Sequence, residues 1–173
     1  MGYTTDFMGS FSCTPALNEK QFAYLEKFTE IRHMRRDPDK CSKISDPIRE
    51  AVNLPIGSEA EYFVNGSETH GHPSILDYNN PPKNQPGLWC QWIPTNEGEN
   101  IEWDGNEKFY DYIEWIKYLN ENFLKPWKIV LSGMVSWQGE STGDIGVIVA
   151  KDGEIRVKEF NFSSIKFEDC DPI

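Results

Sequence analysis

All six tryptophans of this chain of 173 residues lie within residues 87–139. This stretch ends in a run at 129–138 in which every second residue shares one apolar face, as in a half-buried β-strand. Residues 88–93 carry bulky side chains on both faces and predict an interior strand that is covered on both sides. After a turn at 94–100, residues 101–103 can return antiparallel to that strand.

Between these strands, residues 105–124 carry apolar residues at intervals of three and four, which is the period of a helix buried along one side. We expect Asp104 to be the N-cap of this helix and Glu107 to complete a capping box. Trp115 and Tyr118 lie beside the apolar stripe. If both are exposed, a homodimer is credible, because aromatic side chains are enriched at protein interfaces.

Residues 2–11 also alternate, and they predict a first strand whose aromatic side faces the core. Asn18 and Gln21 have the spacing of a capping box at the start of a helix over residues 19–34. The helix is predicted to end in a group of three arginines, where positive charge suits the helix dipole. These arginines are Arg32, Arg35 and Arg36.

A second interpretation of the three arginines is an anion pocket, because guanidinium groups match phosphate and carboxylate oxygens. A tryptophan could then stack on the base of a nucleotide-like ligand. On this interpretation the ligand-binding residues are Arg32, Arg35, Arg36, Trp89, Gln91, Trp137 and Gln138.

Residues 37–86 form the least regular segment, with a short helix predicted from Asp46 to Val52 and a short strand at 61–64. An irregular segment of this length inside a domain is typically functional or mobile. His70 and His72 could share a metal ion, but no third ligand is identifiable, so we expect no metal. The sequence has no Gly-rich phosphate loop, and we expect no cofactor.

At the C-terminal end, two alternating runs flank Asp152 and Gly153, which predicts a hairpin. An acidic tail at 163–173 is expected to fray. The assembled fold is α+β, with a mainly antiparallel sheet of about five or six strands and two helices on one face. Its core is predicted to be a ferredoxin-like split βαβ unit, extended by the hairpin and interrupted by the irregular insert at 37–86. Residues 1–173 are expected to form one domain.

The charge and cysteine content limit the possible functions. The chain has 17 basic and 28 acidic residues, a net charge of −11. This excess of negative charge argues against general nucleic-acid binding and favours a basic partner. No apolar run approaches the length of a membrane helix, and no secretory signal is recognisable, so we expect a cytoplasmic protein. The scattered cysteines are expected to be free and mostly buried: Cys13, Cys41, Cys90 and Cys170.

Four motifs resemble those of a family of small uncharacterised proteins from bacteria and their phages. They are GYTTDF at 2–7, GLWCQW at 87–92, WDGNEKFY at 103–110 and WQGE at 137–140. The resemblance implies a cytosolic accessory protein, and it transfers no catalytic residue to this chain.

Two functions of different classes follow. The first is a non-enzymatic binding protein that recognises an anionic, nucleotide-like ligand or a basic protein partner. The second is a small enzyme acting on a phosphate- or nucleotide-containing substrate, in which arginines hold the anion and a side chain transfers protons. The candidates for that acid or base are Asp6, Glu140 and Asp144, together with His70 and His72. The enzyme requires an arginine and one of these groups to converge on one cleft.

Overall fold

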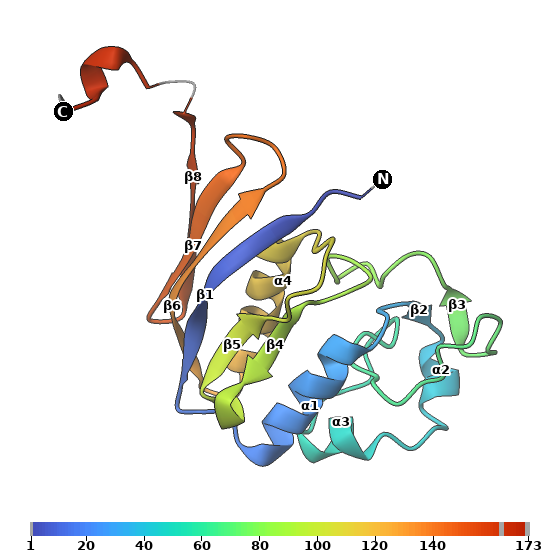
Figure 1. Cartoon of the computed structure of the whole chain (residues 1–173). Coiled ribbons are helices and arrows are strands. Elements are labelled where there is room, and N and C mark those ends of the chain that lie inside the picture. Colours follow the sequence, from blue (N-terminus) through green and yellow to red (C-terminus); the bar gives the residue numbers. More distant parts are fainter. Residues whose placement is uncertain (1, 163–164, 172–173) are drawn as a thin grey trace.

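The computed structural model describes residues 2–162 and 165–171 of the chain. Its main sheet has six strands in the order β4–β5–β1–β6–β7–β8, and all neighbouring strands are antiparallel (Figure 1). These strands are β1 (Thr5–Thr14), β4 (Trp92–Thr95), β5 (Asn100–Trp103), β6 (Val130–Gly139), β7 (Ile145–Lys151) and β8 (Glu154–Phe160). The predicted α+β class and the mainly antiparallel sheet are therefore confirmed.

Four α-helices occur in the described part of the chain, three of them in segments where a helix was predicted and one, at 38–41, where none was predicted. The two longer ones are α1 (Glu19–Glu30) and α4 (Tyr112–Leu119), and a π-helical turn (Asn120–Leu124) continues α4. The short helices α2 (Pro38–Cys41) and α3 (Pro47–Ala51) belong to the insert. None of these helices is long and apolar enough for a membrane span, a result that covers the described residues only.

The core lies between the helices and one face of the sheet, and it is largely aromatic. Side chains from β1, α1, β4, α4 and the π-helical turn meet there edge to face, for example Phe11 with Trp92 at 5.7 Å and Phe28 with Phe123 at 5.0 Å. The longest strand pair, β1 with β6, runs through its centre. Gly133 in β6 has φ +137°, and a Cβ there would lie 2.6 Å from the Ser10 carbonyl oxygen. Only glycine therefore permits this close approach of the two strands.

The start of α1 is confirmed, but its predicted end is wrong. The Asn18 side chain accepts from the Gln21 amide and the Gln21 side chain accepts from the Asn18 amide, as in a capping box. The helix stops at Glu30, because the backbone then becomes extended and the His33 amide donates to the Leu88 carbonyl. The arginines therefore do not end a helix: Arg35 and Arg36 form strand β2 (Arg35–Arg36), paired with β3 (Ile75–Asp77).

The predicted helix at 105–124 begins later than expected. Asp104 caps no helix, because its carboxylate accepts both the backbone and the side-chain N–H of Asn106 in a local turn. Helix α4 starts after Asp111, which has a left-handed backbone with φ 54°. Trp115 and Tyr118 are 0% and 7% exposed, so the condition set for a homodimer through these two side chains is not met.

Two predicted strands also need correction. Residues 88–91 are outside the sheet, and β4 is an edge strand rather than an interior one. Pro94 suits an edge, since proline cannot donate to a second neighbour. The expected strand at 61–64 does not form, because the Val64 amide donates to the side chain of Asp46 instead of to a strand.

Other expectations are met or fall partly outside the described residues. The helix predicted from Asp46 is observed as α3, with the Asp46 side chain accepting from the Arg49 amide. Cys13, Cys41 and Cys90 are buried free thiols, and Cys170 is an exposed one. Within the predicted tail, residues 167–169 form a 3-10 turn, whereas 163–164 and 172–173 lie outside the described residues.

Candidate functional site

A groove of about 620 Å³ lies beside the edge strand β4. One wall is the end of α1 with Thr29 and Glu30, and the floor is the segment that leads into β4. The opposite wall is the loop between β5 and α4. From the segment and the loop the lining residues are Trp89, Cys90, Gln91, Ile93, Asp104, Asn106, Glu107, Lys108 and Tyr110.

Gln91 fixes the shape of this groove. Its side-chain oxygen accepts from the Trp103 indole at 3.2 Å, and its side-chain nitrogen donates to the Glu107 carbonyl at 3.0 Å. The Asp104 amide donates to the Gln91 backbone carbonyl at 3.0 Å. One polar side chain thus ties the floor segment to the end of β5 and to the wall loop, which makes the groove a built feature rather than a gap between mobile loops.

Two exposed aromatic side chains stand at the groove. Trp89 is 43% exposed and Tyr110 is 53% exposed. The Arg32 guanidinium lies 5.7 Å from the centre of the Trp89 ring and 4.6 Å from that of Tyr78, so the chain itself already holds one cation against Trp89. The Tyr110 hydroxyl accepts from the Tyr3 amide at 3.1 Å, which positions that ring.

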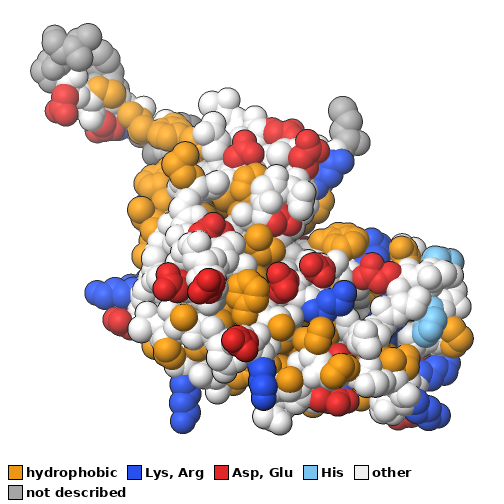
Figure 2. Space-filling view, turned by 60° about the horizontal axis from the view of Figure 1, so that its bottom comes forward, with side chains coloured by type: hydrophobic (Ala, Val, Ile, Leu, Met, Phe, Trp, Pro, Cys, Tyr) orange, Lys and Arg blue, Asp and Glu red, His pale blue; other side chains and the backbone are white. Residues whose placement is uncertain are grey.

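The charge of the groove is negative. It is lined by the carboxylates of Glu30, Asp104 and Glu107 and by one lysine, Lys108. Figure 2 shows a similar distribution over a wider face, where Asp and Glu side chains are spread among apolar ones across the middle and most Lys and Arg side chains project at the rim. Such a surface attracts cations and repels anions.

The three predicted anion-binding arginines have separate partners within the protein. Arg32 donates from Nε to the Tyr78 carbonyl at 3.1 Å. Arg35 forms an ion pair with Glu59 at 2.7 Å. Arg36 is buried, and it donates to the Ser74 hydroxyl at 3.0 Å and to the Ser67 carbonyl at 2.9 Å. Burial lowers the pKa of the Arg36 guanidinium.

The predicted carboxylates gather where β1 meets the β6–β7 loop. Asp6 pairs with Gln138 across the two strands, next to Trp137. Asp144 accepts from the Trp137 indole at 3.0 Å and from the Tyr3 hydroxyl at 2.5 Å. Glu140 accepts from the Thr4 amide at 2.7 Å. Among the described residues, no hydrogen bond or ion pair joins this group to the three arginines.

The remaining predicted residues lie in the insert. His70 packs edge to face on Tyr78, and His72 Nδ1 lies 2.9 Å from the Ser74 hydroxyl. The described residues contain no group of three or more His, Cys, Asp or Glu side chains that could hold a metal ion.

Of the predicted ligand-binding residues, Trp89 and Gln91 line the groove, whereas Trp137 and Gln138 lie on β6 and are not among its lining residues. The sequence prediction missed Tyr110 and did not assign Glu30, Asp104 or Glu107 to a site. The high density of acidic residues between Cys90 and Lys125 was the available signal for two of these carboxylates. Comparisons with models of protein families, with curated proteins and with solved structures found no match to this chain.

Proposed function

We propose that this protein is a non-enzymatic binding protein whose groove beside β4 takes a positively charged segment of a protein partner. The observation that carries this proposal is the pairing of exposed Trp89 with the carboxylates of Glu30, Asp104 and Glu107 in one groove. Lysine and arginine side chains fit such a site in two ways, since their alkyl stems pack on aromatic rings and their charged ends pair with carboxylates.

The distribution of arginines supports this function over the binding of an anion. Arg35 already has Glu59 as its partner, and Arg36 is enclosed by Ser67 and Ser74. An anionic ligand would have to displace these internal contacts. At the groove, Glu30 has only an exposed ion pair with Lys27 at 3.7 Å, the Asp104 carboxylate accepts from the neutral Asn106, and Glu107 is exposed, so a cationic segment meets weaker competition. The separation of the arginines from Asp6, Glu140 and Asp144 likewise favours binding over phosphate chemistry, which needs an anion clamp and an acid or base in one cleft.

We place this function in the cytoplasm and in a single domain, as expected from the sequence. We further propose that β1, α1, β4, β5, α4 and β6 correspond to a ferredoxin-like split unit, with β7 and β8 added at one edge. The strand order β4–β5–β1–β6 and the antiparallel pairing of these strands support this assignment.

The binding proposal is tested with three dye-labelled peptides of equal length, one rich in Lys and Arg, one rich in Asp and Glu, and one neutral. Fluorescence anisotropy at low salt should show binding of the basic peptide alone, and its affinity should fall as salt screens the charges. In the Trp89→Ala variant the affinity should fall about 30-fold, because a central aromatic contact is typically worth about 2 kcal/mol.

Charge is tested separately with the double variant Asp104→Asn/Glu107→Gln, which we expect to weaken binding about fivefold to 30-fold. The matched control is Glu99→Gln/Glu121→Gln, which removes the same charge from exposed positions that do not line the groove. Far-UV circular dichroism confirms that each variant is folded. Equal losses of peptide affinity in the two double variants would show that only the net charge of the protein matters. Unchanged affinity in Trp89→Ala would show that the peptide does not bind in the groove.

A further inference from the structure

A second surface is the outer face of the main sheet, which meets the groove at Ile93, the β4 residue that pairs with Glu102. Neighbouring residues of a strand point to opposite faces, and the inward ones, such as Phe11, Leu131, Val135 and Ile148, are buried in the core. The outward ones face away from α1 and α4, and in Figure 1 no helix lies over β6, β7 and β8 on that side. The outward apolar residues of β1, β6, β7 and β8 are Met8, Val130, Met134, Ile145, Val147, Val149 and Phe160.

The register of the strands brings these side chains together. Ser10 pairs with Met134, and Met134 pairs with Val149 on its other side. In the next row, Met8 pairs with Ser136, which in turn pairs with Val147. Met8 is 78% exposed and Met134 58%. The centre of the face is therefore a continuous area of methionine, valine and serine, in a protein that otherwise carries many charges.

The face also carries charged side chains of both signs, on β1 (Asp6), β7 (Lys151) and β8 (Glu154, Arg156 and Lys158). In the row of Met134 the charges lie at the two ends and have opposite signs. Arg156 on β8 pairs with Val149 in the row of Met134. At the other margin Ser12 pairs with Asn100, and continuing this register places Glu102 beside Ser10 in the same row. The row thus reads, across five strands, Glu102, Ser10, Met134, Val149 and Arg156.

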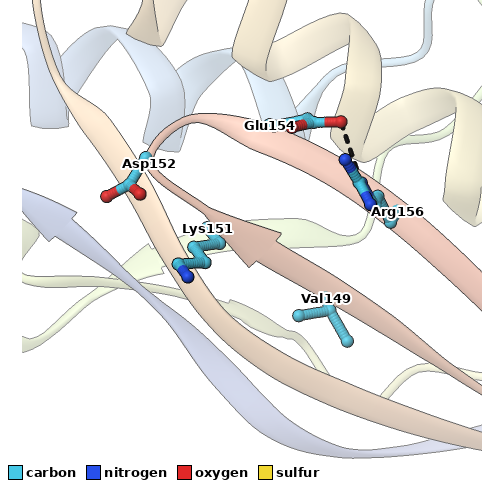
Figure 3. Close-up of a pocket in the computed structure, with 5 residues that line it drawn as sticks. All are labelled: Val149, Lys151, Asp152, Glu154 and Arg156. Carbon is cyan, nitrogen blue, oxygen red and sulfur yellow. Dashed lines mark hydrogen bonds and ion pairs between the residues drawn. The ribbon is translucent and has the colours of Figure 1, made fainter.

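A shallow hollow of about 600 Å³ marks the β7–β8 margin of the face. Figure 3 shows its lining residues, which come from β7, from the turn at Asp152 and from β8, with the ion pair between Glu154 and Arg156 at 2.9 Å. The hollow carries two basic side chains, Lys151 and Arg156, and two acidic ones, Asp152 and Glu154. The Arg156–Glu154 pair is highly exposed, so a carboxylate from outside can compete for Arg156. Val149 supplies its apolar side.

We propose that this face packs against the same face of a second copy of the chain, in a two-fold dimer built like a β-sandwich. The two-fold axis runs parallel to the strands and passes above β6. Rotation about it places each row of residues opposite the same row of the second copy, read in the reverse strand order. Met134 then meets Met134 of the second copy on the axis, and Arg156 of each copy lies over Glu102 of the other. The charged row is therefore complementary to itself in this arrangement.

The size of the face suits a modest dimer. Five strands at about 4.8 Å spacing and about seven residues at 3.3 Å each give a footprint of about 550 Å² per copy. Two copies then bury about 1,100 Å², which is at the lower end of specific interfaces. Two sheets packed face to face are separated by about 10 Å, a distance that methionine and valine side chains fill from both sides.

The oligomeric state tests this proposal. Sedimentation velocity over a range of protein concentrations should show a monomer that converts to a dimer. Met134→Lys should weaken association at least about 100-fold, because it buries two like charges on the axis. Leu76→Lys is the matched control: it replaces an apolar side chain that is 59% exposed on β3, outside this face, and it should leave the dimer intact.

Charge reversal then tests the orientation of the two copies. Glu102→Arg alone and Arg156→Glu alone should each weaken the dimer about tenfold, since each change turns two attractive pairs into repulsive ones. The double variant Glu102→Arg/Arg156→Glu should recover most of that loss. A monomer at every concentration, a dimer that Met134→Lys leaves unchanged, or a double variant weaker than both single ones would each overturn the proposal. Peptide binding in Met134→Lys should stay at its original level, so the test is separate from that of the groove.

Discussion

Asp46 provides the sharpest test of how the insert at 37–86 is held to the rest of the domain. Its side chain is 0% exposed. One carboxylate oxygen accepts from the Val64 amide at 2.9 Å and lies 3.3 Å from Arg49 Nε, and the other accepts from the Arg49 amide. The change Asp46→Asn keeps the shape of the side chain but removes its charge. It thus isolates the electrostatic part of these contacts.

The size of the effect follows from the burial of the partner. Arg49 is 8% exposed, so removing the Asp46 charge leaves a guanidinium buried without this counter-charge. Removing one partner of a buried ion pair typically lowers the free energy of unfolding by about 3–5 kcal/mol. Asn retains one acceptor oxygen, and Arg49 still donates to the Leu54 carbonyl, so we expect the lower end, about 3 kcal/mol. For a domain of this size, a loss of about 3 kcal/mol lowers the melting temperature by about 6–12 °C. It is a large share of the total stability of a domain, which is about 5–15 kcal/mol.

Urea unfolding followed by circular dichroism measures the loss in the free energy of unfolding. A double-mutant cycle with Arg49→Met shows how much of that loss comes from the contact between Asp46 and Arg49. Arg49→Met leaves the buried Asp46 carboxylate without a counter-charge, and Asp46→Asn leaves Arg49 with only the exposed Glu50 at 3.5 Å. The double variant leaves neither buried charge. The double variant should therefore be less destabilised than the sum of the single ones by about 1–3 kcal/mol. A loss below about 1 kcal/mol in Asp46→Asn, or additive losses in the cycle, would show that this pair behaves like a surface contact.

Two further predictions concern buried polar side chains. Burial lowers the pKa of His33 from 6.5 to about 3, so His33 is neutral in the folded protein while the unfolded chain takes up a proton below pH 6.5. The free energy of unfolding should therefore fall as the pH drops from 6.5 towards 3, by up to about 1.4 kcal/mol per pH unit. Between pH 6.5 and pH 5 the contribution of His33 is about 1.6 kcal/mol, so urea unfolding of His33→Gln should show a pH-dependent loss smaller by that amount. His70→Gln is the control and should show the full loss. Asn120 is buried and donates to the Gly153 carbonyl at 2.9 Å. Asn120→Ala should cost about 1–3 kcal/mol in urea unfolding and speed hydrogen exchange at the β7–β8 turn, because the carbonyl loses its donor.

The features that the sequence predicted well are those that local signals determine. The capping box at Asn18 and the Asp46-Pro47 helix start are each set by residues within one helical turn. The strand β6 was predicted at 129–138 and is observed at Val130–Gly139, because its alternation matches a single buried face along its whole length. In these places the local preference and the final fold agree, so periodicity and capping were sufficient.

The incorrect predictions arise where tertiary contacts chose between local alternatives. Asp104 has the right residue type for a helix cap and also for a turn around Asn106, and only the pairing of its backbone with Gln91 selects the turn. Similarly, bulk on both sides of residues 88–93 is equally consistent with an interior strand and with an edge segment that packs against α1. Side-chain alternation reports burial, but it does not report how many neighbours a strand has.

The groove was hard to predict for the same reason. The sequence predicts Trp89 and Gln91 as binding residues for an anionic ligand, because arginines match its charge and a tryptophan can stack on a nucleotide base. The structure turns those arginines towards Tyr78, Glu59 and Ser74 and brings Glu30 to the groove from a different element. The sign of the charge at a site depends on which side chains find partners inside the protein, and a sequence alone does not contain that information.

The groove and the outer sheet face use different physical interactions and occupy different parts of the sheet, so neither excludes the other. The groove lies beside β4, at one edge of the strand order, whereas the proposed two-fold axis lies over β6. Rotation about that axis carries β4 of each copy beyond β8 of the other, which leaves both grooves open at opposite ends of the dimer. A partner with two basic segments would then meet two grooves at once, and the second contact would form at the high effective concentration set by the first. Self-association through the outer sheet face would in this way strengthen binding in the groove without any new contact inside it.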